Sequence, residues 1–135
     1  MPTPDPLTHS LDLLAERAGD VTEAVYDRLF AQYPELEGLF AMDTDGGVRG
    51  SMLAQAFECL MDLSEGSGTM AETVIRSERE NHDSYDVPAG MFEVFFSIIR
   101  DVVKEAAGSD WSPLMEAAWA SALEDATRLS QPLPA

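Results

Sequence analysis

Apolar residues recur along this chain at the three- and four-residue spacing of a helix face. No stretch alternates with the period of two that a half-buried strand requires. The strongest helical pattern follows Pro88, where one face would carry Met91, Phe92, Phe95, Ile99, Val102, Val103 and Ala106. Glycine and proline separate one periodic segment from the next. The pattern therefore predicts an all-α fold, with about six helices around one core.

The same punctuation predicts where the helices begin and end. Asp5 and Pro6 are typical of a capped first turn, and Asp20 with Glu23 resembles a capping box at the second helix. The predicted helices cover about 6–18, 20–33, 36–40, 48–63, 71–82, 88–106 and 112–131. We expect a single domain over 1–135 with a core of about 7–130, because a chain of this length supports one core.

Charge argues against several classes of partner. The chain has 8 Lys and Arg against 25 Asp and Glu, which gives a formal net charge of −17. Nucleic acids and anionic membranes would repel it, so neither is an expected partner, and the acidic residues should form a solvated face. There is no apolar run of membrane-spanning length and no secretion signal, so we expect a cytoplasmic protein. A homodimer is compatible with these features.

His82 is the strongest candidate for a metal ligand. It ends a predicted helix and shares a face with Val74 and Ile75, where a neutral imidazole could bind a metal or haem iron. The alternative is a core or helix-terminal histidine without a ligand. The only other histidine, His9, lies in a polar context typical of the surface, and the single cysteine, Cys59, is typical of a small buried residue.

Other site chemistries find little support. No Gly-rich phosphate motif is present, and no serine has His and Asp partners at interpretable spacing. Asp43 and Asp45 lie in a Gly-rich loop, but Ala54 stands where a calcium loop needs its twelfth-position glutamate.

Three segments resemble bacterial single-domain globins, which look like the globin half of flavohaemoglobins. They are residues 25–40 (VYDRLFAQYPELEGLF), the pattern His82-x-x-Tyr85-x-Val87 with Phe92 beyond it, and Trp111-Ser-Pro followed by Ala118-Trp119. The matches run from about Leu11 to Leu129 in the right order. The resemblance implies a three-on-three globin fold that binds haem b.

On the proximal side of the haem, the resemblance implies that His82 is the axial ligand of the iron. Val87 and Phe92 would pack on that side, and Phe40 would stack on the porphyrin. Plain core packing is an alternative, or an additional, role for Phe40.

On the distal side, the resemblance implies that the Tyr26 hydroxyl donates a hydrogen bond to a diatomic ligand. The alternative is a core tyrosine bonded to a backbone carbonyl. Leu53 would form the apolar wall over the iron. Arg49 falls at the distal position often held by His or Gln, where it would reach the ligand or a haem propionate, unless it is an exposed arginine at the rim. Met52 takes that position if the register shifts.

These roles imply a globin that reversibly binds a diatomic ligand, O2 with NO and CO as further candidates, at ferrous iron. Relatives with nitric oxide dioxygenase chemistry commonly have Tyr where Phe92 stands, and a late buried Glu where this chain has 131–134 (QPLP). We therefore expect a binding protein rather than an enzyme. One alternative is a nitric oxide dioxygenase that works with a separate reductase. Another is a haem-free globin-fold sensor or protein-interaction module.

Overall fold

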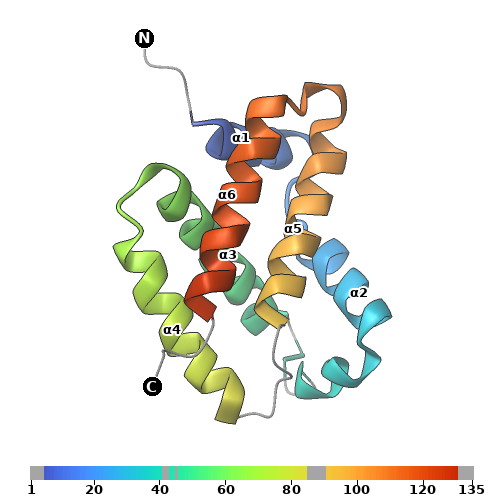
Figure 1. Ribbon diagram of the computed structural model, residues 1–135. Helices are drawn as coiled ribbons and strands as arrows, with labels where there is room; N and C mark the ends of the chain where they lie inside the picture. The colour runs from blue at the N-terminus through green and yellow to red at the C-terminus, as the bar shows by residue number, and fades with distance from the viewer. Residues whose placement is uncertain (1–4, 41–42, 45, 85–90, 131–135) are drawn as a thin grey trace.

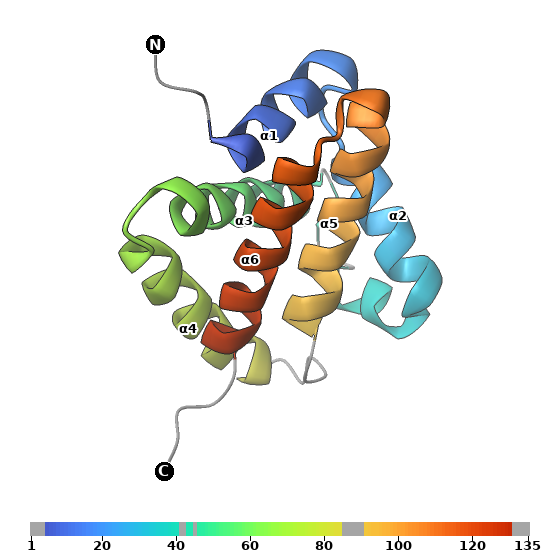
Figure 2. The same ribbon diagram turned by 45° about the horizontal axis from the view of Figure 1, so that its top comes forward.

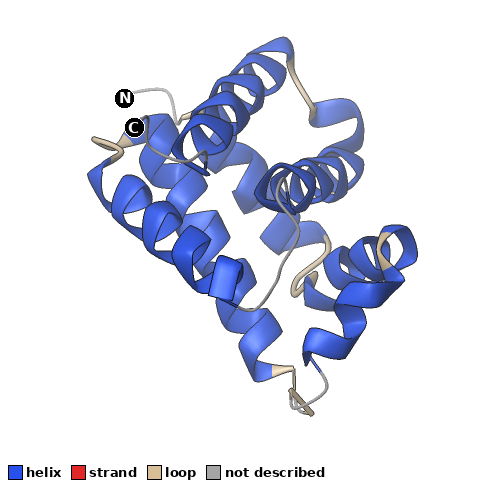
Figure 3. Ribbon diagram, turned by 60° about the horizontal axis from the view of Figure 1, so that its bottom comes forward, coloured by secondary structure: helices blue, strands red, loops and turns tan. Residues whose placement is uncertain are grey.

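A computed structural model describes residues 5–40, 43–44, 46–84 and 91–130, except the side chains of 39, 79–84, 91–92 and 130 (Figure 1). The described part of the chain is helical and contains no strand, as Figure 3 shows. The elements are α1 (Pro6–Arg17), α2 (Thr22–Gln32), η1 (Pro34–Phe40), α3 (Gly47–Glu65), α4 (Thr69–Ser84), α5 (Met91–Ala107), η2 (Gly108–Asp110) and α6 (Pro113–Ser130). Every predicted helix has a counterpart, and the all-α prediction is confirmed.

The six α-helices form two layers of three. In one layer α1, α5 and α6 contact one another, and in the other α3 contacts both α2 and α4. The layers meet where α6 crosses α3 and α4, where α5 packs on α2, and where α1 touches α3 (Figures 1 and 2). This is the three-on-three sandwich expected from the resemblance.

The core between the layers is apolar and continuous. Its largest fully buried side chains include Trp119, Tyr26, Leu60 and Ile99, from four different helices. One buried polar contact crosses it. The Trp119 indole N–H donates to the Ser10 hydroxyl at 2.8 Å, and that hydroxyl donates to the carbonyl of Leu7. Buried Ser10 and Trp119 therefore satisfy each other between α1 and α6.

Side chains from outside a helix satisfy several helix ends. The Asp5 carboxylate accepts a hydrogen bond from the Thr8 amide, as predicted for the first helix. The Asp62 carboxylate, near the end of α3, accepts one from the Ala71 amide in the first turn of α4. Arg17 donates to the carbonyls of Ala106 and Ala107 at the end of α5, at 3.2 and 2.7 Å. These hydrogen bonds satisfy backbone groups that a helix leaves without partners at its ends, and those of Asp62 and Arg17 join neighbouring helices.

The predicted capping box at the second helix is wrong. Val21 is buried and holds the N-cap position, and its carbonyl accepts a hydrogen bond from the Val25 amide. The Asp20 carboxylate instead accepts from the amide and hydroxyl of Thr22. The helix therefore begins at Thr22, with Val21 and not Asp20 as its N-cap.

None of the described helices is long and apolar enough to cross a membrane.

Candidate functional site

Tyr26 lies at the centre of an aromatic cluster between the two layers. The centroid of its ring is 5.5 Å from those of Phe40 and Phe95 and 5.8 Å from that of Phe30. The Phe40 ring meets it edge-on, and Phe30 and Phe40 also contact each other. Helices α2 and α5 and the end of η1 supply these side chains, so the cluster joins three elements.

The Tyr26 hydroxyl is buried and has no hydrogen-bond partner among the described residues. The residue as a whole is 1% exposed. A buried hydroxyl without a partner is unfavourable, because it has lost water and gained nothing in exchange. The alternative of a core tyrosine bonded to a backbone carbonyl therefore finds no carbonyl in the described part of the chain. The hydroxyl is instead suited to a ligand that accepts a hydrogen bond.

Burial raises the pKa of Tyr26 far above its usual value. The positive charge of Arg49 opposes this shift, and the negative charge of Asp43 adds to it. The phenol therefore keeps its proton at any physiological pH and remains a hydrogen-bond donor.

Asp43 and Arg49 form an ion pair at the start of α3. The carboxylate oxygens of Asp43 accept hydrogen bonds from the Val48 amide at 2.9 Å and from the Arg49 amide at 3.0 Å. The Arg49 Nε donates to the same carboxylate at 3.0 Å, and its Nη2 donates to the Asp43 carbonyl at 3.1 Å. The hydrogen bonds from the amides of Val48 and Arg49 hold the pKa of Asp43 below its usual range, and the bond from Val48 has the larger effect. Asp43 thus caps α3 and anchors Arg49 together.

The sequence predicted that Arg49 reaches a ligand or a haem propionate, or that it is exposed at the rim. Neither prediction included the ion pair with Asp43. Its side chain is 30% exposed and that of Asp43 only 3%, so Arg49 is not a freely solvated rim arginine and Asp43 is not part of a solvated acidic face. Leu53, one helical turn further along α3, is buried at 3% exposure, as an apolar wall requires. Met52 beside it is partly buried. The contact of Arg49 with a ligand or a propionate stays a prediction.

The predicted proximal residues lie at the edge of what the structure describes. His82 is in the last turn of α4, a helix that packs on α3 and α6, and its side chain lies outside the described residues. Phe92 is in the first turn of α5, and its side chain is likewise not described. Val87 lies outside the described residues. Their roles toward haem stay predictions.

Phe95 and Asp43 belong to the site, but the sequence did not single them out for it. The helical spacing placed Phe95 on the inner face of its helix, and only the packing of α5 on α2 brings it to Tyr26. Asp43 was recognisable only as an acidic residue in a loop. No sequence pattern indicated that the start of α3 would enclose it.

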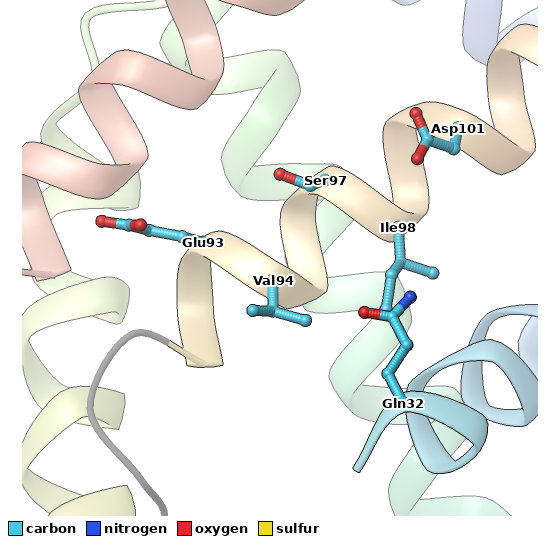
Figure 4. Close-up of a pocket in the computed structure, with 6 residues that line it drawn as sticks. All are labelled: Gln32, Glu93, Val94, Ser97, Ile98 and Asp101. Atoms are coloured by element: carbon cyan, nitrogen blue, oxygen red, sulfur yellow. The ribbon is translucent and has the colours of Figure 1, made fainter.

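Other candidates in the described structure do not form a second site. One hollow has a volume of about 280 Å³ and lies between α2 and α5. Its lining side chains, drawn in Figure 4, are Gln32 of α2 and Glu93, Val94, Ser97, Ile98 and Asp101 of α5. It contains none of the predicted site residues. Burial raises the pKa of Cys59 to about 11, so the thiol stays protonated and unreactive. No cluster of three or more His, Cys, Asp or Glu among the described residues suits a metal ion.

Comparison with known proteins gives one match. A family model described as Globin matches residues 23–128, most of the chain. Comparisons with curated proteins and with solved structures give no match. The matched range contains every site residue named above.

Proposed function

Because the chain belongs to the globin family, whose members generally bind haem and a gas, we propose that it binds haem b and a diatomic ligand reversibly. Dioxygen is the first candidate for that ligand, with NO and CO as further ones. The buried Tyr26 hydroxyl without a partner in the described structure carries this proposal. It is a donor kept dry and protonated, and a diatomic ligand with partial negative charge is the acceptor that it lacks.

The residues of the chain divide the work as follows. His82 on α4 supplies the imidazole ligand, and Phe40 supplies an aromatic face for the porphyrin. Leu53 excludes water from the distal side, and Tyr26 donates the hydrogen bond that holds the ligand. Haem iron, when bound, supplies a reversible coordination position that no side chain can offer. We also propose that, within the globin family, this chain is most similar to single-domain bacterial globins and to the globin half of flavohaemoglobins.

The first experiment is the visible spectrum of the purified chain, before and after haem is added, and after reduction with and without CO. We expect an intense Soret band that shifts when CO binds. A chain that shows no Soret band after reconstitution would be a haem-free globin-fold module, and the proposal would fail.

The second experiment compares His82→Ala with His9→Ala. His9 is the only other histidine and lies exposed on α1, so its replacement controls for the loss of an imidazole. We expect His82→Ala to abolish or greatly weaken haem binding, and His9→Ala to leave it unchanged. Equal haem uptake by the two variants would remove His82 as the axial ligand.

A further inference from the structure

The Asp43–Arg49 pair is a built arrangement with a fixed geometry. One carboxylate oxygen of Asp43 accepts the Val48 amide, and the other accepts both the amide and the Nε of Arg49. The carbonyl of Asp43 accepts Nη2 of the same guanidinium. Two hydrogen bonds from backbone amides hold Asp43 against the first turn of α3, and two from the guanidinium hold Arg49 against Asp43, so the two opposite charges lie at hydrogen-bond distance.

The pair is also connected to the distal side of the proposed site. The Asp43 amide donates to the carbonyl of Phe40 at 2.9 Å, and the Phe40 ring is 5.5 Å from the ring of Tyr26. Arg49 lies one turn before Leu53 on α3, so both belong to the same part of that helix. The opposite effects of the two charges on the pKa of Tyr26 agree with this placement.

Charge near a poorly hydrated pocket determines which ligands enter it. An arginine alone would attract anions, because its side chain is only 30% exposed and water screens its charge only in part. With the buried carboxylate of Asp43 at hydrogen-bond distance, most of that attraction is cancelled. Bound CO carries little charge, so its affinity changes little in either case.

We propose that Asp43 is a specificity-determining residue that neutralises Arg49 and so makes the distal pocket favour uncharged diatomic ligands over small anions. Asp43 acts through Arg49 and is a positioning residue, not a ligand-contacting one. This inference rests on the proposed function, because it requires a ligand-binding pocket beside Tyr26.

The test measures azide binding to the ferric protein and CO binding to the ferrous protein. Asp43→Asn keeps the shape of the side chain and removes its negative charge. Its one amide oxygen can replace only one of the two carboxylate oxygens that accept hydrogen bonds from Val48 and Arg49. We expect azide to bind roughly five- to tenfold more tightly, and CO affinity to stay within about twofold.

The matched control is Asp27→Asn, which makes the same charge change on α2. Asp27 follows Tyr26 in the sequence, but it is exposed, so water screens its carboxylate. Asp27→Asn should therefore leave azide affinity nearly unchanged.

A second variant reverses the sign. Arg49→Gln leaves the Asp43 carboxylate uncompensated, so azide should bind more weakly by a similar factor, roughly five- to tenfold. The double variant Asp43→Asn/Arg49→Gln should return azide affinity close to that of the unmodified protein. This series keeps the test decisive even if one variant binds haem poorly.

Three results would overturn the inference: equal azide affinity in Asp43→Asn and Asp27→Asn, azide changes of the same sign in Asp43→Asn and Arg49→Gln, or parallel changes for azide and CO. The failure of the proposed function is a different observation, because the unmodified chain would then show no Soret band at all.

Discussion

At the scale of single residues, we expect the Tyr26 hydroxyl to matter for ligand binding and not for the stability of the fold. Tyr26→Phe removes a buried hydroxyl that has no partner in the described structure. In the haem-free chain we expect the free energy of unfolding to stay equal or rise by up to about 1 kcal/mol, because no hydrogen bond is lost. In the haem-loaded protein we expect dioxygen to dissociate roughly ten- to a hundredfold faster, since a hydrogen bond of about 1.5–3 kcal/mol is removed.

Chemical denaturation and stopped-flow dissociation measure these two quantities. Tyr33→Phe provides the control, because Tyr33 follows the same helix and is only partly buried. A clear loss of stability in haem-free Tyr26→Phe would mean that its hydroxyl has a partner in the folded chain.

The Ser10 hydroxyl is also buried, but unlike that of Tyr26 it both accepts and donates a hydrogen bond. Ser10→Ala leaves the Trp119 indole N–H without its acceptor in the core. We expect the free energy of unfolding to fall by about 1–3 kcal/mol, the usual cost of a buried donor without a partner. Urea denaturation followed by tryptophan fluorescence checks this. Ser121→Ala, an exposed change on the same helix as Trp119, should stay within about 0.5 kcal/mol of the unmodified chain.

At the scale of elements, the start of α4 depends on a side chain from α3. The Asp62 carboxylate accepts the Ala71 amide at 3.0 Å, and α4 is the helix that carries His82. Asp62→Ala should cost about 1 kcal/mol of stability, as helix-capping changes usually do. Amide hydrogen exchange should show the loss concentrated in the first turn of α4.

The control for Asp62 is Glu65→Ala, three residues further along the same helix and exposed. It removes the same charge without removing the cap. If both variants exchange alike in the first turn of α4, the cap does not hold this helix.

The helices were predictable from the sequence because their signal is local. The predicted 88–106 segment corresponds to α5 (Met91–Ala107), since its apolar residues already define one buried face. The partner of Arg49 was not predictable, because it depends on how the chain folds back before α3. Asp43 shows why: an acidic loop residue is solvated in most contexts, and only three-dimensional packing buries it.

The sequence indicated which single side chains belong to the candidate site, but not which side chains from different helices contact each other there. Tyr26 and Leu53, assigned by resemblance, are both buried where the layers meet. Phe95 was missed as a neighbour of Tyr26, because helical spacing gives the direction of a side chain on its own helix but not its neighbour on another.

At the scale of the whole molecule, acid should unfold the chain within a defined range of pH. Hydrogen bonds and ion pairs lower the pKa of Asp20, Asp43, Glu105 and Glu116 in the folded state. Above the usual carboxyl pKa of about 4 these groups are charged in both states, and their stabilisation is complete. Below it the unfolded chain binds protons first, so stability falls with pH until the folded carboxyls are protonated too.

Melting temperatures measured from about pH 6 to about pH 3 test this expectation. Added salt should raise the melting temperature at neutral pH, because it screens the repulsion within a chain of net charge −17. A melting temperature that rises steadily into acid would show that relief of this repulsion outweighs the loss of the four interactions.

The contacts of α1 imply an order of events during synthesis. The hydrogen bond from Trp119 to Ser10 spans 109 positions, and that from Arg17 to the Ala107 carbonyl spans 90. A chain that leaves the ribosome from its amino end therefore exposes the apolar side of α1, with Leu7 and Leu14, long before its partners exist. Closing so large a loop costs entropy that only the finished α5 and α6 can repay. We therefore expect α1, which is made before the other described helices, to be among the last to pack.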